Sequence, residues 1–241
     1  EFRTCNNTTT WVVQSNSSGW TPIWDHGLYG EGQIFTIMDT GVDYNSCWFR
    51  MTGNEAPGPT HRKVIDYTLY GGTAYDGCDN GHGSHVAGTV AGDQSFINPG
   101  NYNYNGMAYK AKFGVQDVGG DDWSACNLGT LNVPSSLTAA FNASYNGGAR
   151  VHTNSWGSSE NAYDGFCVDL DNAMWQHPDF LICFAAGNSG PSGSTVSSPG
   201  TAKNCVTVGA TRQAPTQDQM ADYSSRGPAA DGRKKPTLTA P

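Results

Sequence analysis

The run QIFTIMDTGVD, residues 33–43, is a short apolar stretch that leads into an acidic residue and a glycine turn. Its first seven residues, 33–39, have the near-continuous hydrophobicity of a strand buried on both faces, which is typical of parallel sheets. In open parallel sheets, functional side chains gather where strands end. Asp39 ends this strand and is therefore a candidate functional residue, although an aspartate in this place more often belongs to a turn or a helix cap.

Five further runs share the character of residues 33–39. They lie at residues 63–67, 111–118, 149–157, 180–188 and 204–211. We expect helices between them at residues 83–91, 134–149 and 166–179, where proline or glycine marks several of the ends. This alternation predicts an α/β fold with a doubly wound, mostly parallel sheet flanked by helices.

The domain organisation follows from the lack of repeats or linkers in the sequence. We expect one domain over residues 30–241, preceded by an N-terminal arm at residues 1–29. The arm is expected to be irregular because its composition favours turns. It also lacks the charged and then apolar order of a signal peptide.

The charge pattern argues against nucleic acid as a partner. The net charge is −8, and the one basic cluster, residues 233–235, has the size of a solvated turn rather than a phosphate-binding surface. No apolar run approaches the ~20 residues of a membrane-spanning helix. We therefore expect neither nucleic-acid binding nor a membrane span.

Cysteines and glycosylation sequons point to a secretory protein. The seven cysteines contain no C-x-x-C pair, so a zinc ribbon is not indicated, and the odd number leaves at least one cysteine free or paired outside the chain. Sequons make four asparagines candidates for glycosylation. They are Asn6, Asn7, Asn16 and Asn142. Together these features favour a secreted protein with disulfides and glycans.

Two further stretches add candidate chemistry to Asp39. NGHGSHVAGTVAG, residues 80–92, carries His82 and His85 at the start of an expected helix. The two histidines could share a helix face and bind a metal, but no H-E-x-x-H motif or third ligand is indicated. AAGNSG, residues 185–190, ends a strand in an asparagine between small residues. An aspartate, a histidine and an amide in this order suit imidazole orientation, proton transfer and oxyanion stabilisation.

With these stretches the chain resembles the subtilisin-like serine proteases, the subtilases, from about Gly30 onward. The first two of the matching stretches are highly specific when they occur together. The stretches are IMDTGVD (37–43), NGHGSHVAGTVAG (80–92), NSWGS (154–158), FAAGNSGP (184–191), SPGTAKNCVTVGAT (198–211), SSRGP (224–228) and KKPTLTAP (234–241).

The resemblance implies specific roles for the reacting groups. Asp39 corresponds to the aspartate of the catalytic triad, His82 to the general base and Asn188 to the oxyanion-hole asparagine. By the same correspondence His85 is a structural residue, one turn along the helix, that supports packing.

The resemblance also implies a substrate-binding strand made by Ser155, Trp156 and Gly157. Gly119 and Gly120 correspond to the opposite wall, where the alignment is looser. A peptide would then be held as an added strand between two segments of the protein. Gly157 and Gly187 would leave room for substrate side chains.

The nucleophile is the one departure from the family pattern. The family's serine lies in a G-T-S-M-A segment, which this sequence does not contain, and the chain ends at residues 239–241, just before the glycine that should follow. We therefore expect the domain to be incomplete at its C-terminal end and this chain to be inactive alone. The serine would come from a missing segment or a separate chain. A truncation that nothing complements and a natural non-catalytic homologue are the alternatives.

Three functions follow from these readings. The first is a secreted serine endopeptidase with a polypeptide substrate, and the second is a non-catalytic module that binds peptides or partners. The third is a metal-dependent hydrolase that uses His82 and His85. The protease chemistry requires no cofactor. The family resemblance leaves room for structural calcium, but no compact calcium loop is present, and so no metal site is assigned.

Overall fold

The computed structural model describes most of the chain. The described residues are 6–53, 55–71, 76, 81–96, 98–100, 104–120 and 131–241. The chain divides into two compact units, residues 1–134 (unit 1) and residues 135–241 (unit 2). Each unit is built from parallel strands and helices.

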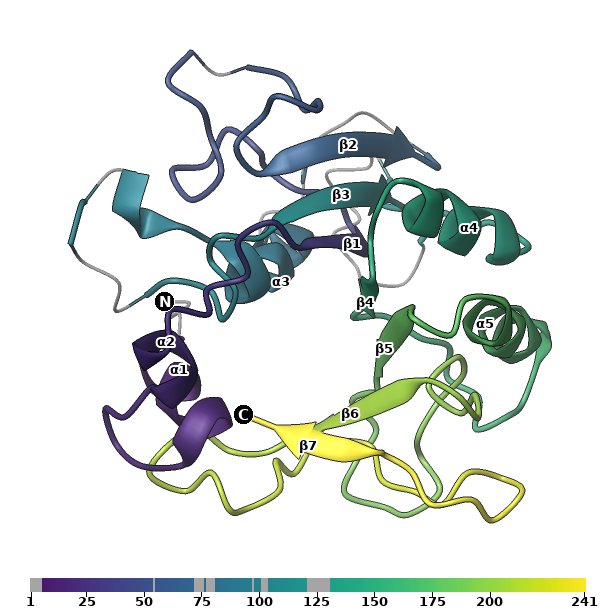
Figure 1. The fold of residues 1–241 in the computed structure, drawn as a ribbon. Helices are drawn as coiled ribbons and strands as arrows, with labels where there is room; N and C mark the ends of the chain where they lie inside the picture. Colours follow the sequence, from purple (N-terminus) through teal and green to yellow (C-terminus); the bar gives the residue numbers. More distant parts are fainter. Residues whose placement is uncertain are drawn as a thin grey trace. The chain divides into compact units, whose positions relative to one another are not determined.

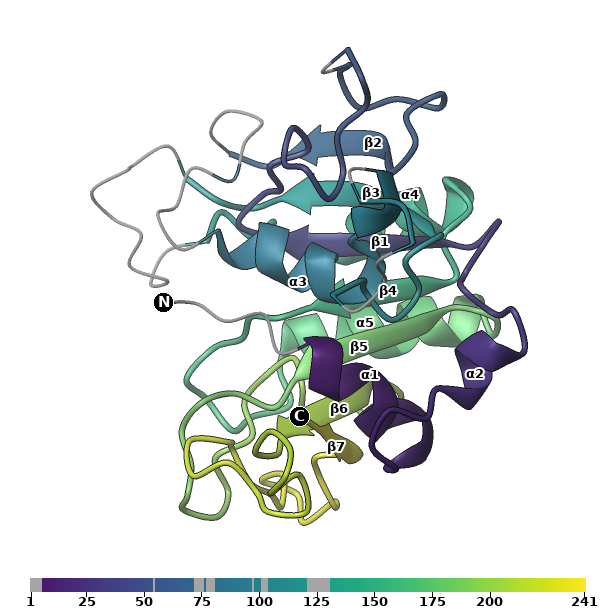
Figure 2. The same ribbon diagram turned by 90° about the vertical axis from the view of Figure 1, so that its left-hand side faces the viewer.

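Unit 1 contains three parallel strands, β1 (Ile34–Asp39), β2 (Val64–Leu69) and β3 (Lys112–Asp117). Their order is β2-β3-β1, and the three lie side by side in both views (Figures 1 and 2). Residues 34–39 of β1 pair with residues 112–117 of β3 without a shift in register. The two strands therefore end together, so the carboxyl ends of β1 and β3 lie at the same end of this sheet.

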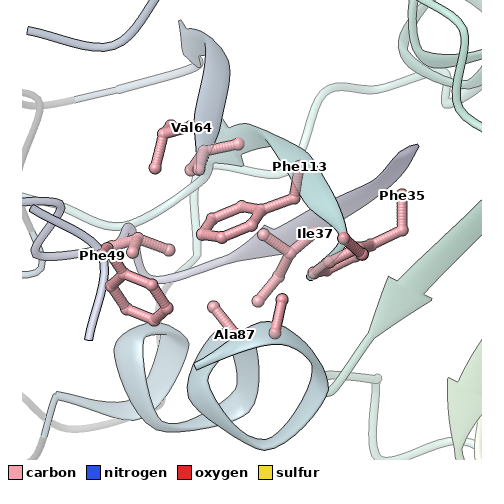
Figure 3. Close-up of a cluster of buried hydrophobic side chains, with 10 residues drawn as sticks. Phe35, Ile37, Phe49, Val64, Ala87 and Phe113 are labelled. Atoms are coloured by element: carbon pink, nitrogen blue, oxygen red, sulfur yellow. The ribbon is translucent and has the colours of Figure 1, made fainter. Parts of the chain in front are cut away.

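The core of unit 1 lies between these strands and helix α3 (His82–Ala91). The buried positions of the helix repeat every four residues, which is the spacing of one helical face. In Figure 3 aromatic and aliphatic side chains from the strands and from the segment after β1 pack onto this face. The labelled members of the cluster are Phe35, Ile37, Phe49, Val64, Ala87 and Phe113.

The N-terminal arm is helical, so the expectation of an irregular arm is wrong. The arm forms α1 (Asn6–Ser15) and α2 (Pro22–Asp25). Later in unit 1, a short 3₁₀ helix, η1 (Gln94–Phe96), follows α3. Trp24 in α2 packs edge-on against Tyr109 with ring centroids 5.4 Å apart. This contact anchors the one-turn helix α2, which is too short to be stable by itself.

Unit 2 contains four parallel strands in the order β4-β5-β6-β7. Their bounds are β4 (Val151–Asn154), β5 (Leu181–Ala185), β6 (Val206–Ala210) and β7 (Leu238–Ala240). Helix α5 (Gly165–Gln176) packs against β5 and against helix α4 (Thr138–Asn146). Asp164 caps α5 by accepting a hydrogen bond from the backbone N–H of Cys167 at 3.2 Å.

The predicted parallel α/β fold is confirmed, and each of the six predicted strands and three predicted helices is present within four residues of its expected bounds. Strand β7 was not predicted. Burial on both faces is right for β1 and β3 and wrong for β2, β4, β5 and β6, whose residues alternate or are exposed. Most residues of β2 are partly or fully exposed because this strand pairs with β3 alone. In the part of the chain that is described, no helix has the length and hydropathy to cross a membrane.

Candidate active site

Asp39 and His82 form a close pair in unit 1. The Nδ1 atom of His82 lies 2.6 Å from Oδ1 of Asp39, whose side chain is 3% exposed, while that of His82 is 31% exposed. A carboxylate can only accept hydrogen bonds, so the proton of the neutral imidazole is on Nδ1 and the lone pair on Nε2. The arrangement is that of an oriented base with one free nitrogen.

The pair forms because the start of α3 lies against the turn that follows β1. Asp39 is the last residue of β1 and His82 is the first residue of α3. Gly83 allows this approach, since a Cβ atom at this position would collide with the carbonyl oxygen of Gly41. The glycine after the histidine therefore determines how near the base comes to the acid.

The surroundings of His82 favour its protonated form. The hydrogen bond to Asp39 is the largest influence and raises the pKa of His82 above its ordinary value of 6.5. Burial opposes this rise, and the negative charges of Asp39 and Asp76 add to it. The imidazolium that a general base forms when it accepts a proton is thus stabilised where it arises.

Thr40 supports both Asp39 and the start of α3, and it was not identified from the sequence. Its backbone N–H donates to Oδ1 of Asp39 at 2.8 Å, and its hydroxyl accepts from the backbone N–H of Gly83 at 3.0 Å. The residue before α3, Gly81, has no side chain to cap the helix, so Thr40 supplies a cap from a distant part of the sequence. Its position directly after Asp39 is the only sequence signal that could have indicated this role.

Gly119 also lies at this end of unit 1. A Cβ atom at Gly119 would lie 2.6 Å from the carbonyl oxygen of Thr40, so the segment after β3 packs closely on the turn after β1. The amide of Asn132 donates to the carbonyl oxygen of Gly119 at 3.1 Å. Gly120 is exposed beside it. The structure therefore brings Asp39, His82 and Gly119 together.

The remaining predicted site residues belong to unit 2. Ser155, Trp156 and Gly157 follow β4, and Gly187 and Asn188 follow β5, the strand that pairs with β4. Parallel strands end at the same edge of a sheet, so these two segments emerge side by side. The side chain of Asn188 is exposed.

Ser197 lies close to both Gly157 and Gly187 and was not singled out from the sequence. Built Cβ atoms at Gly157 and Gly187 would lie 3.0 and 3.2 Å from its hydroxyl oxygen. Gly187 has a φ of +106°, a backbone conformation that side chains rarely adopt. Trp156 packs edge-on against Phe184, with ring centroids 5.1 Å apart, which fixes the segment before Gly157.

His85 does not support packing as expected, because its side chain is exposed. The buried face of α3 is made by Gly83, Ala87 and Ala91. His85 lies two residues from Gly83 and from Ala87, about 200° around the helix from each, and so points away from that face. Among the described residues, no group of three or more His, Cys, Asp or Glu side chains is placed to hold a metal ion.

The sequons and cysteines have varied surroundings. Asn7 and Asn16 are exposed, whereas Oδ1 of Asn142 accepts a hydrogen bond from Nε2 of His177 at 2.9 Å. The side chain of Asn6 lies outside the described residues. Four cysteines are described, and each is a free thiol. They are Cys47, Cys167, Cys183 and Cys205. The other three, at positions 5, 78 and 126, lie outside the described residues.

Comparison with solved structures supports the fold. The chain is similar to the prenylagaramide maturation protease PagA, with a TM-score of 0.63, 22% identity and coverage of 91% of this chain and 66% of that one. It is also similar to the CspB protease of Clostridium perfringens, with a TM-score of 0.67, 13% identity and coverage of 99% and 80%.

Comparison with curated proteins and with family models gives the family. The serine protease/ABC transporter B family protein tagA of Dictyostelium discoideum is 35% identical over 83% of this chain, which spans 11% of that protein. Serine protease AprX of Bacillus subtilis (strain 168) is 30% identical over 89% of the chain, which spans 47% of it. The chain thus covers less than half the length of either relative. The Subtilase family model matches residues 30–241, and the chain therefore belongs to the Subtilase family.

Proposed function

We propose that this chain carries the acid–base machinery of a serine endopeptidase. The observation that carries the proposal is the 2.6 Å contact between Oδ1 of Asp39 and Nδ1 of His82, which leaves Nε2 as the basic atom. Membership of the Subtilase family supports peptide-bond hydrolysis as the reaction. The chemistry uses side chains and backbone groups only and needs no cofactor.

The proposed reaction is acyl transfer through a serine. Nε2 of His82 removes the proton of the serine hydroxyl as its oxygen attacks the scissile carbonyl carbon, and Asp39 stabilises the imidazolium. The amide of Asn188 and a backbone N–H hold the oxyanion. The imidazolium then gives the same proton to the leaving amine, and a water molecule repeats the sequence to release the acid.

We assign the nucleophile to a segment outside these 241 residues. The family motif that carries the serine is not in the sequence, and the serines that are present belong to other family motifs. In the described part of unit 1, no hydrogen bond reaches Nε2 of His82.

The proposed substrate is a polypeptide bound as an extended strand. Segments 119–120 and 155–157 would pair with its backbone, and glycines 157 and 187 would leave space for its side chains. The proposed location is the extracellular space or the secretory pathway, in a protein with glycans, whose disulfides would involve the cysteines at positions 5, 78 and 126. The exposed sequons at Asn7 and Asn16 support glycosylation. Among the relatives is the minor extracellular protease Vpr of Bacillus subtilis (strain 168), 33% identical over 84% of this chain.

Labelling of the full-length protein with a fluorophosphonate probe, followed by peptide mass analysis, tests this proposal. We expect label on a serine outside residues 1–241 and no label after His82→Ala. His85→Ala is the matched control, because it removes an exposed histidine from the same helix and should leave labelling unchanged. Label on a serine within these residues would contradict the assignment of the nucleophile. Peptide binding without labelling or hydrolysis would favour the non-catalytic module instead.

A further inference from the structure

Asp76 is a buried carboxylate beside the Asp39–His82 pair that the reaction described above does not use. It is 6% exposed. Its Oδ1 accepts a hydrogen bond from the hydroxyl of Thr40 at 3.1 Å, and its Oδ2 accepts one from the backbone N–H of Ser84 at 2.7 Å. Both carboxylate oxygens therefore have a partner, and each partner belongs to a different element.

These hydrogen bonds tie Asp76 to both members of the pair. Thr40 directly follows Asp39, and Ser84 lies in the first turn of α3, two residues after His82. Asp76 thus links the turn that bears the acid to the helix that bears the base. It also supplies an acceptor for a helix N–H that the cap residue, Gly81, does not satisfy.

Asp76 also contributes to the electrostatics of the base. In the described part of unit 1, the charged groups that act on His82 are Asp39, at the end of β1, and Asp76, on the segment before α3. Burial raises the pKa of Asp76 above 3.8, while hydrogen bonds from Ser84 and Thr40 oppose that rise and favour the anion. The start of a helix favours an anion as well.

We propose that Asp76 is a positioning residue for the Asp39–His82 pair, whose carboxylate fixes the start of α3 against the turn after β1 and places a second negative charge near the imidazole. This inference rests on the proposed function. It predicts that His82 loses part of its basicity when the charge is removed and loses part of its alignment when the side chain is removed.

Two substitutions in the full-length protein separate these effects. Asp76→Asn removes the charge and still allows a hydrogen bond to each partner, because the amide oxygen can accept from Ser84 and the amide N–H can donate to the Thr40 hydroxyl, which reverses the direction of that bond. We expect the acid limb of kcat/KM against pH to move to lower pH by roughly half a unit. Asp76→Ala also removes the hydrogen bonds, and we expect a further fall in plateau kcat/KM on the order of 10-fold.

Asp66→Asn is the matched control, since it makes the same charge change on the exposed side of β2 and should leave the profile unchanged. An Asp76→Asn profile that coincides with the wild-type profile would overturn the inference. Should Asp76→Ala not fold, Asp76→Asn still decides the question. Wild-type protein that hydrolyses no peptide would contradict the proposed function instead.

A second measurement does not depend on hydrolysis. NMR titration of histidine-labelled protein follows the imidazole of His82 directly, with its resonance identified by its loss in His82→Ala. The titration midpoint should fall in Asp76→Asn and stay in place in Asp66→Asn. Equal midpoints in wild type and Asp76→Asn would refute the role of Asp76 even if the protein were not a protease.

Discussion

Gly83 shows how one residue without a side chain determines the geometry of the acid–base pair. Its Cα lies where the first turn of α3 meets the backbone after β1, and the space for a Cβ is taken by the carbonyl oxygen of Gly41. This contact holds His82 at the end of the strand that carries Asp39. The sequence shows the glycine beside the histidine, but only the fold shows which backbone atoms it contacts.

We predict that Gly83→Ala destabilises the protein by about 1–3 kcal/mol or more, because the added methyl group must push the helix away from the turn. The same shift should lengthen the contact between Asp39 and His82 and lower kcat. Urea unfolding and hydrolysis assays measure the two effects. Gly165→Ala is the control, since a Cβ atom there would meet nothing within 4 Å. Equal stability of the two variants would contradict the prediction.

At the scale of elements, α3 is held at its start by groups from outside the helix. Thr40 accepts from the N–H of Gly83, and Asp76 accepts from the N–H of Ser84, while Gly81 contributes no side-chain cap. The helix N-terminus is thereby bonded to the segments that carry and support the acid. Its stability and the alignment of His82 depend on the same hydrogen bonds.

We predict that Thr40→Val lowers the free energy of unfolding by about 2 kcal/mol, because a buried N–H and a buried carboxylate oxygen each lose a partner. Thr40→Ser keeps the hydroxyl and should lose less than about 1 kcal/mol. Urea unfolding of the two variants makes the comparison. A valine variant as stable as the serine variant would show that these hydrogen bonds do not hold the helix.

Elements with a strong local signal could be predicted, and those that depend on distant contacts could not. Strand β1 has a long apolar run, and α3 has small apolar residues after a glycine, so both were found. Strand β7 is three residues long, and α1 is rich in threonine, so neither has a distinctive pattern. In the site, Asp39 and His82 stand in recognisable motifs. Thr40, Asp76 and Ser197 became visible only through contacts between residues far apart in the sequence.

At the scale of the whole molecule, the predicted site residues are divided between the two units. Unit 1 holds Asp39, His82 and Gly119, while unit 2 holds segment 155–157 and Asn188. Each unit also has buried polar groups of its own that make its stability depend on pH. In unit 2 the clearest is His152, which is fully buried between Phe141 and Phe180.

Burial lowers the pKa of His152 to about 3, whereas the ordinary value of 6.5 applies once the chain unfolds. The folded state therefore keeps the ring neutral while the unfolded state takes up a proton below pH 6.5. Stability is fully present above that pH and falls as the pH drops toward 3. Between pH 7 and pH 5 we predict a loss of about 2 kcal/mol from this residue.

His152→Phe should remove that part of the pH dependence, which urea unfolding at pH 7 and pH 5 would measure as a smaller difference between the two. His85→Ala, which removes an exposed histidine, should leave the difference unchanged. The same pH dependence in His152→Phe and wild type would show that the buried ring is not the cause.

Asp39 lies 2.6 Å from Nδ1 of His82, and this contact determines how chemical probes react with the ring. With one nitrogen occupied and the side chain still 31% exposed, alkylating reagents can attack the ring from one side only. A halomethyl ketone would therefore modify Nε2 and leave Nδ1 untouched. The site of the adduct would report, atom by atom, which nitrogen the protein offers to its substrate.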